Sequence, residues 1–320
     1  MAHLEKDMKY QLRSGVIGHA VGDALGVPVE FKSREELMRD PVCDMRSYGT
    51  HGMPAGTWSD DTSMEIALMQ SLIDRKTIDY EDIMNNFVKW YRDDEFTATG
   101  ITFDVGGTCA GAIGNYYRRG TDPLQCGGAG VSNNGNGSLM RILPLAYICH
   151  AQNIVGQARY ELTRNISSLT HAHEISVLGC YIYVNYVCHL LDGEDAKTAY
   201  EHTKQDDYSM FTNDAKTAYE RVLAANIAAF DAADISGSGY VVSSLEAALW
   251  CLLNSTSYKD ATLKAVNLGK DTDTVGAITG SLAGICYGYD NIPQEWVNQL
   301  QRRDYLLSLC DELVATEVEI

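Results

Sequence analysis

Two short segments, far apart in the chain, each place a pair of aspartates beside hydroxyl residues. Residues 58–62 read WSDDT, and residues 271–274 read DTDT. An apolar stretch with helical spacing follows each segment directly. Helix capping explains one acidic or hydroxyl side chain at each helix start, but not the whole set. The remaining carboxylates and hydroxyls are therefore available for chemistry.

If the fold brings these segments together, four carboxylates share one small volume: Asp60, Asp61, Asp271 and Asp273. Like charges that close cannot all stay ionised without compensation. Hard cations with oxygen ligands, Mg²⁺ or Mn²⁺, supply that compensation better than Zn²⁺ does. Four carboxylates are enough to bridge two such ions. The pattern predicts a two-ion site for Mg²⁺ or Mn²⁺.

Three further segments carry polar groups that suit such a site. Glu30 follows a predicted helix end at residues 26–28 and is a candidate general base or ligand of a sugar hydroxyl, the alternative being a surface glutamate. Residues 133–138 read NNGNGS, which favours either an anion-binding nest or a flexible turn. His171 and His173 are two residues apart, which argues against a zinc pair on one helix face. Cys109 has no recognisable histidine partner motif, so a thiol nucleophile is disfavoured.

The elements that must position these groups are predicted to be helices nearly throughout. Thr62 and Glu65 match a capping box at the start of one of them. Glycines recur every four residues at 18–26 and at 276–288, so two helices are expected to approach closely at the centre of the molecule. Residues 195–201 recur as 214–220, and each copy has an Asp that suits a helix start. Helical spacing covers residues 8–24, 62–74, 80–91, 153–169, 175–191, 215–229, 243–253, 274–287 and 293–313.

Composition narrows the class of protein. The chain has 320 residues and no linker-like stretch, so residues 1–320 are predicted to form a single domain. A net charge of −18 argues against a nucleic-acid partner. Nine scattered cysteines without a C-x-x-C pair indicate reduced thiols and a cytoplasmic location. The N-terminus is polar, and no apolar run is expected to reach the roughly 18 residues of a membrane span, so neither a signal peptide nor a membrane span is predicted.

Together these segments resemble the ADP-ribosylglycohydrolases. The matching residues are 22–31 (GDALGVPVEF), 56–68 (GTWSDDTSMEIAL), 103–108 (FDVGGT), 133–146 (NNGNGSLMRILPLA), 170–171 (TH) and 269–284 (GKDTDTVGAITGSLAG). They occur in the family's order and span most of the chain. Two departures are a serine at position 59, where threonine is usual, and a lysine at position 270, where a second glycine is usual.

The resemblance implies an all-α, compact orthogonal helical bundle that binds two Mg²⁺ or Mn²⁺ ions and releases ADP-ribose from a modified protein. It assigns Glu30, Asp61 and Asp273 to catalysis. It assigns metal binding to Ser59, Asp60, Asp61, Asp271, Asp273 and Thr274. It assigns substrate binding to Asp104, Asn134, Gly135, Asn136, Gly137, Ser138 and His171.

The expected bond is the N-glycosidic bond to arginine, with other linkages left open. Residues 192–239 match no motif and are a candidate region for target recognition. One alternative function is an ADP-ribose-binding or immunity protein that neutralises an ADP-ribosylating toxin by contact. Another is a phosphohydrolase that cleaves the diphosphate, and the simplest alternative is a helical protein whose aspartates only cap helices.

Overall fold

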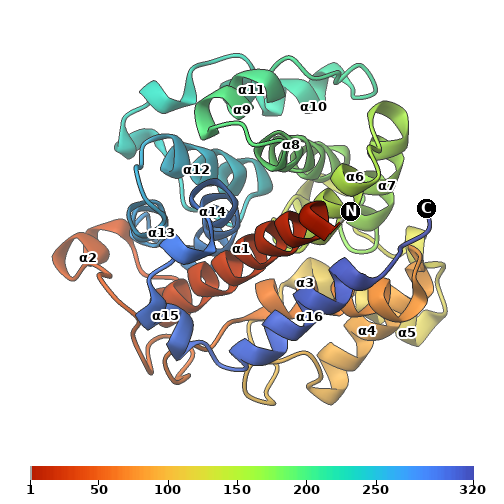
Figure 1. Cartoon of the computed structure of the whole chain (residues 1–320), viewed down its shortest axis with the longest axis horizontal. Helices are drawn as coiled ribbons and strands as arrows, with labels where there is room; N and C mark the ends of the chain where they lie inside the picture. Colours follow the sequence, from red (N-terminus) through yellow and green to blue (C-terminus); the bar gives the residue numbers. More distant parts are fainter. Residues whose placement is uncertain (1) are drawn as a thin grey trace.

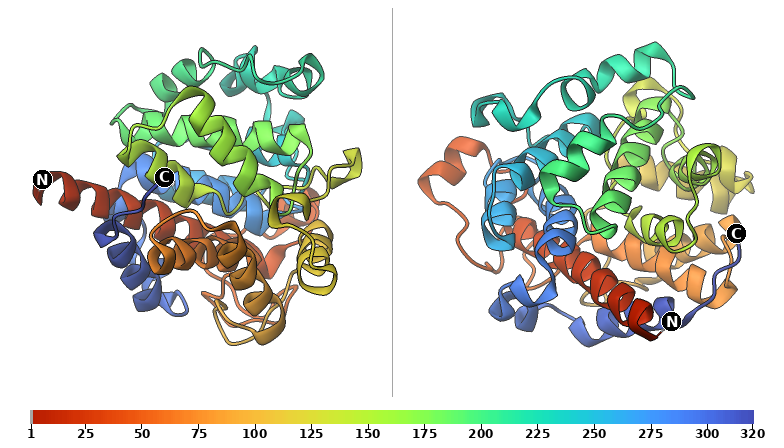
Figure 2. Two further views of the ribbon diagram at one scale, coloured as in Figure 1. Left: turned by 90° about the vertical axis from the view of Figure 1, so that its right-hand side faces the viewer. Right: turned by 45° about the horizontal axis from the view of Figure 1, so that its top comes forward.

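The structure, a computed structural model, describes residues 2–320, with side chains from Met8 onward. These residues form sixteen α-helices and six short 3-10 helices, and within them β-structure is limited to three isolated bridges (Figures 1 and 2). The all-α prediction is confirmed. The α-helices are α1 (Ala2–Gly26), α2 (Arg34–Arg39), α3 (Asp60–Arg75), α4 (Tyr80–Asp93), α5 (Gly107–Arg119), α6 (Leu143–Ala151), α7 (Gly156–Ser168), α8 (Glu174–Leu191), α9 (Ala196–Thr203), α10 (Asn213–Ala218), α11 (Glu220–Leu223), α12 (Val241–Leu253), α13 (Tyr258–Val266), α14 (Thr272–Tyr287), α15 (Gln294–Gln299) and α16 (Arg303–Ala315). The 3-10 helices are η1 (Val27–Val29), η2 (Pro123–Gln125), η3 (Val131–Asn133), η4 (Ile227–Ala229), η5 (Ala232–Asp234) and η6 (Tyr289–Asn291).

Helices α1 and α14 lie side by side and antiparallel at the centre of the molecule. A Cβ atom added to Gly22 would lie 2.0 Å from the carbonyl oxygen of Gly276, and one added to Gly18 would lie 2.3 Å from that of Gly280. Only glycine permits backbones this close, as small residues do in membrane bundles. The predicted central glycine contact is confirmed. It brings the end of α1 beside the start of α14, where the second Asp segment lies.

Helix α8 lies in the core, against α6, α7, α9 and α12. It has 18 residues and is apolar enough to cross a membrane, so the expectation that no apolar run reaches this length was wrong. However, 83% of this helix is buried inside the molecule. A core helix has this length and composition because it is surrounded by other helices on every side.

Two predicted helices are interrupted. Residues 215–229 form parts of α10 and α11 followed by η4, and residues 293–313 divide into α15 and α16. The second break centres on Arg302, which has a left-handed backbone (φ 53°). At this break Gln301 donates its backbone N–H to the carbonyl of Gly56, and its own carbonyl accepts from the Trp58 indole at 2.9 Å. The interruption therefore holds the segment that leads into the first Asp motif.

The start of α3 also differs from the prediction. Ser59 is the N-cap, and its side chain accepts from the N–H of Asp61. Thr62 lies inside the helix, and Glu65 is fully buried beside His19 instead of reaching back to a cap. The capping box predicted at Thr62 and Glu65 was therefore wrong. The repeated DAKTAYE segment begins a helix at Asp195, as predicted. The second copy instead starts inside α10, which is capped by Thr212, and runs into the start of α11.

Candidate active site

The first Asp segment is held by an aspartate from the central helix α1. The Asp23 carboxylate accepts from the backbone N–H of Ser59 at 2.9 Å and from the hydroxyl of Thr62 at 2.6 Å. Burial raises the pKa of Asp23 to about 6, and these hydrogen bonds oppose the rise. This contact directs the turn before α3 so that Asp60 and Asp61 face inward. Asp23 was given no role by the sequence pattern, although it lies within the GDALG segment.

The second Asp segment reaches the first through a hydroxyl. Thr274, in the first turn of α14, donates from Oγ1 to Asp61 Oδ2 at 3.3 Å. Ser59 donates to the same oxygen at 3.0 Å. Asp271 is the N-cap of α14, and Asp273 follows in the first turn. The structure thus brings together all six of the predicted metal-binding side chains at the starts of two helices.

The carboxylates of this cluster are buried and crowded. Burial, together with repulsion from neighbouring carboxylates, raises the pKa values of Asp60, Asp61 and Asp273 well above their usual range. Burial also raises the pKa of Asp271. Among the described residues, no lysine or arginine forms an ion pair with any of these four groups. All four carboxylates can therefore be ionised together only if a positive charge is bound among them.

The oxygen atoms of this cluster fit a bound cation. Asp61 Oδ1 and Asp273 Oδ2 are buried and have no hydrogen-bond partner within the described chain. Oxygens of Asp23, Asp61 and Asp273 lie within 4.8 Å of one another. Buried polar atoms without partners are rare and indicate a missing ligand or water. A donor set made only of carboxylate and hydroxyl oxygens suits Mg²⁺ or Mn²⁺.

Glu30 lies at the edge of this cluster and is buried, which excludes the reading as a surface glutamate. Burial raises its pKa to about 7, against the effect of a hydrogen bond with His51. That hydrogen bond raises the pKa of His51. The His51 ring lies between Phe31 and Phe103, with centroids 6.0 and 5.1 Å away. Sequence reasoning missed His51, which stands in a loop with no motif around it.

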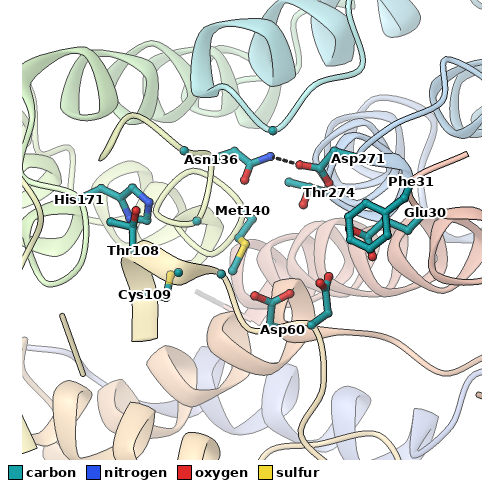
Figure 3. A pocket seen from close by; sticks show the side chains of 16 residues that line it. Glu30, Phe31, Asp60, Thr108, Cys109, Asn136, Met140, His171, Asp271 and Thr274 are labelled. Atoms are coloured by element: carbon teal, nitrogen blue, oxygen red, sulfur yellow. Dashed lines mark hydrogen bonds between the residues drawn. The ribbon is translucent and has the colours of Figure 1, made fainter. Parts of the chain in front are cut away.

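A cavity of about 350 Å³ opens above the carboxylates (Figure 3). Asp60, Asp271 and Thr274 line one side, and Glu30 lies beside them. The N-cap Gly106 and the first-turn residues Gly107 and Thr108 of α5 also line the cavity, as do Gly135, Asn136 and Gly137 of a loop. The N–H groups in the first turn of a helix have no partners within the helix and favour anions. The cavity therefore lies between a carboxylate cluster that suits a cation and a helix start that suits an anion.

The NNGNGS loop divides into a cavity-facing part and a supporting part. Asn136 donates to Asp271 Oδ2 at 2.8 Å and to Ser244 Oγ at 2.9 Å, which ties the loop to the cation cluster (Figure 3). Asn134 does not line the cavity, since it bonds to Ser176 and Val131. Ser138 is likewise turned away, toward Ser167 and Cys180. The next helix, α6, begins only at Leu143, so the helix start in the cavity wall belongs to α5.

His171 and Asp104 complete the cavity wall. His171 is almost fully buried and pairs through Nδ1 with the Thr170 hydroxyl at 2.8 Å. Burial lowers the pKa of His171 to about 3, so it is a neutral imidazole at neutral pH. His173 instead caps the start of α8. Burial raises the pKa of Cys109, which makes its thiol a poor nucleophile.

The model of the ADP-ribosylglycohydrolase family matches residues 5–319. The chain belongs to this family. It is 30% identical to ADP-ribosylarginine hydrolase Tri1 of Serratia proteamaculans over 97% of this chain and 80% of that protein. It is 32% identical to the Tri1 protein of Pseudomonas putida over 94% of this chain and 77% of that protein. A solved structure titled ADP-ribosylglycohydrolase-related protein complex matches with a TM-score of 0.81 and 29% identity, over 98% of this chain and 99% of that one.

Membership of the ADP-ribosylglycohydrolase family identifies the chain as a hydrolase and the cavity as its candidate active site. The two departures from the family pattern are both accommodated. Ser59 keeps the hydroxyl oxygen, which contacts Asp61. Lys270 has a left-handed backbone (φ 70°), which explains why glycine is usual there, and its side chain is exposed. Its backbone forms hydrogen bonds with the backbone of Phe31 and Lys32, which joins the second Asp segment to the Glu30 segment.

Proposed function

We propose that this ADP-ribosylglycohydrolase uses two Mg²⁺ or Mn²⁺ ions to remove ADP-ribose from arginine side chains of modified proteins. The observation that carries the proposal is the convergence of both Asp segments beside one cavity. Asp60 and Asp271 line this cavity, whereas Asp61 and Asp273 are buried next to them and hold oxygens without hydrogen-bond partners. The names of the two Tri1 relatives support arginine as the linked residue. The expected partner is an ADP-ribosylated protein, and ADP-ribose is the expected product.

The ligands proposed for the ions are Ser59, Asp60, Asp61, Asp271, Asp273 and Thr274. When bound, the ions would supply positive charge beside the reacting bond and lower the pKa of a water molecule there. Asp61 and Asp273 provide the partnerless oxygens of this set.

The chain's own groups then account for binding and orientation. The first turn of α5 and the cavity-facing glycines Gly135 and Gly137 suit the diphosphate, since they offer backbone N–H groups without side chains in the way. Neutral His171 and Asp104 lie along the same wall. Asn134 and Ser138 do not contact the substrate. Their hydrogen bonds hold the loop that carries the cavity-facing glycines.

Hydrolysis adds the water oxygen to the anomeric carbon of the ribose and breaks the bond from that carbon to the arginine nitrogen. One water proton is transferred to the departing nitrogen as the bond breaks. The transition state resembles an oxocarbenium ion, as in other glycosidic cleavages. Glu30 is buried beside the carboxylates and forms a hydrogen bond with His51. Its proposed role is either transfer of this proton or binding of a ribose hydroxyl.

The test is release of free ADP-ribose from arginine-ADP-ribosylated protein, with Mg²⁺ or Mn²⁺ and with EDTA. We expect release that EDTA, Asp61→Asn and Asp273→Asn each abolish, whereas Asp231→Asn, a change of an exposed aspartate, leaves it intact. AMP and ribose phosphate as products would instead identify a phosphohydrolase. Binding of ADP-ribose by the metal-loaded protein without release would favour the binding or immunity function.

The cytoplasmic location remains part of this proposal. All nine cysteines are free, and eight of them are buried or partly buried. Free thiols in this number suit a reducing compartment.

A further inference from the structure

A second group of metal-ligating side chains lies where α8 joins α9, at the opposite end of α8 from His171. His189 is in the last turn of α8, Glu194 is in the connecting loop, and His202 is in the last turn of α9. One nitrogen of each histidine and one oxygen of Glu194 lie within 4.8 Å of one another. Neither the proposed function nor the family motifs involve these residues.

The two distances from Glu194 to the histidines suit a tetrahedral ion. Glu194 Oε1 lies 2.8 Å from His202 Nδ1 and 3.6 Å from His189 Nδ1. Zinc bonds to nitrogen and oxygen of about 2.0 Å place neighbouring tetrahedral ligands about 3.3 Å apart. The two observed distances lie on either side of that value. The imidazole rings are 5.6 Å apart and tilted by 56°, so they converge instead of stacking.

The hydrogen bonds of His189 determine which of its nitrogens is available. Its Nε2 lies 3.3 Å from Asp206 Oδ2, and a carboxylate can only accept, so Nε2 carries the proton. In the neutral ring, Nδ1 then carries a lone pair and is a hydrogen-bond acceptor. It faces another acceptor, Glu194 Oε1. Either a cation between these two atoms or a proton on Nδ1 removes the conflict, and the hydrogen bond with Asp206 raises the pKa of His189, which favours the proton until a cation replaces it. A ligating histidine whose other nitrogen donates to a carboxylate is the usual arrangement around zinc.

Further observations favour an ion over a plain network of ion pairs. Glu194 Oε2 is buried and has no hydrogen-bond partner among the described residues. The His202 side chain is 50% exposed, which gives an ion access from solvent. Two imidazoles and one carboxylate suit Zn²⁺ and not Mg²⁺.

We propose that His189, Glu194 and His202 form a Zn²⁺ site, with Asp206 orienting His189 and water in the fourth position. The ion joins the end of α8 to α9 and the loop between them, at the start of the region that matched no family motif. The 18 residues of α8 separate this site from the cavity by about 27 Å. The site therefore supports the structure of the 192–206 segment and takes no part in the hydrolysis.

The experiment is Zn²⁺ titration of the tag-free, full-length protein in excess Mg²⁺, which occupies the carboxylate cluster. We expect one Zn²⁺ per chain, with affinity reduced by at least about tenfold in Asp206→Asn and by more in His202→Ala and Glu194→Gln. The matched control is His150→Ala, since His150 forms a similar ion pair with Asp192 at 3.0 Å nearby but outside the triad. It should bind Zn²⁺ as the wild type does.

Thermal unfolding provides a second measurement. Zn²⁺ should raise the Tm of the wild type and of His150→Ala, and leave the Tm of His202→Ala unchanged, because only a native-state ligand stabilises the fold. Glu194→Gln keeps the shape of the side chain if His202→Ala fails to fold. The proposal is overturned if no Zn²⁺ binds in excess Mg²⁺, or if Zn²⁺ binds equally well to His202→Ala and Glu194→Gln.

Discussion

Replacement of Gly22 by alanine tests how closely the central helices must approach. The added Cβ would lie 2.0 Å from the carbonyl oxygen of Gly276, whereas ordinary contact begins at 3.4 Å. The obstructing atoms are backbone atoms of Gly276 and Ala277 on α14, so no side chain can rotate away. The helices must therefore separate locally by about 1 Å or more, because a packed interior has no space to absorb the atom.

Overpacking typically costs about 1–3 kcal/mol, and a backbone clash belongs at the upper end of that range. Alanine's helix preference offsets about 1 kcal/mol of this cost. We expect Gly22→Ala to lower the free energy of unfolding by about 2 kcal/mol or more. The matched control is Gly111→Ala in α5, where the glycine is exposed and no atom lies within 4 Å of the added Cβ. The free energy of unfolding of that variant should rise by up to about 1 kcal/mol.

The assay is urea unfolding of both variants in EDTA, with the midpoint and slope compared with those of the wild type. Calorimetric titration with Mn²⁺ supplies a functional measurement. Because Gly26 packs against the backbone of Asp273, separation of the helices should also weaken Mn²⁺ binding. An unchanged midpoint for Gly22→Ala would refute the reasoning, since it would mean that the two backbones do not meet as described.

Three further outcomes are expected. Asp61→Asn and Asp273→Asn should each lower metal-dependent hydrolysis by at least about a hundredfold, since loss of outer-shell groups alone costs about 10–100-fold; retention of activity in steady-state assays would contradict the metal assignment. Gly137→Ala would place a Cβ 2.8 Å from both Cys109 Sγ and His171 Cε1, so we expect a raised KM with a smaller change in kcat, and an unchanged KM would remove the loop from the binding site. Burial holds the pKa of His171 at about 3 against 6.5 in the unfolded chain, so the unfolded state takes up the proton first and stability falls as pH drops from 6.5 toward 3. In urea unfolding, the free energy of unfolding of His171→Asn should fall less than that of the wild type between neutral pH and about pH 5. Parallel pH dependences of the two proteins would argue against a buried neutral histidine.

The positions of most helices follow from local pattern. The glycine spacing of α1 and α14 predicted their contact, because glycines four residues apart lie on one helix face. The failures have causes that are distant in sequence. The break at Arg302 depends on hydrogen bonds to the 56–58 segment, which is far away in sequence. The spacing of Thr62 and Glu65 is typical of a capping box, but Glu65 is buried beside His19 and caps no helix.

The sequence by itself determined the class of fold, the two Asp segments and the kind of ion that their oxygens suit. These conclusions depend on residue type and short spacing, which are local properties. Only the tertiary structure decided which groups meet. It placed Asp23 and His51 behind the carboxylates and Glu30, turned Asn134 and Ser138 away from the cavity, and set the start of α5 in its wall. Such contacts join residues far apart in the chain, and the packing of whole helices, not local preference, fixes them.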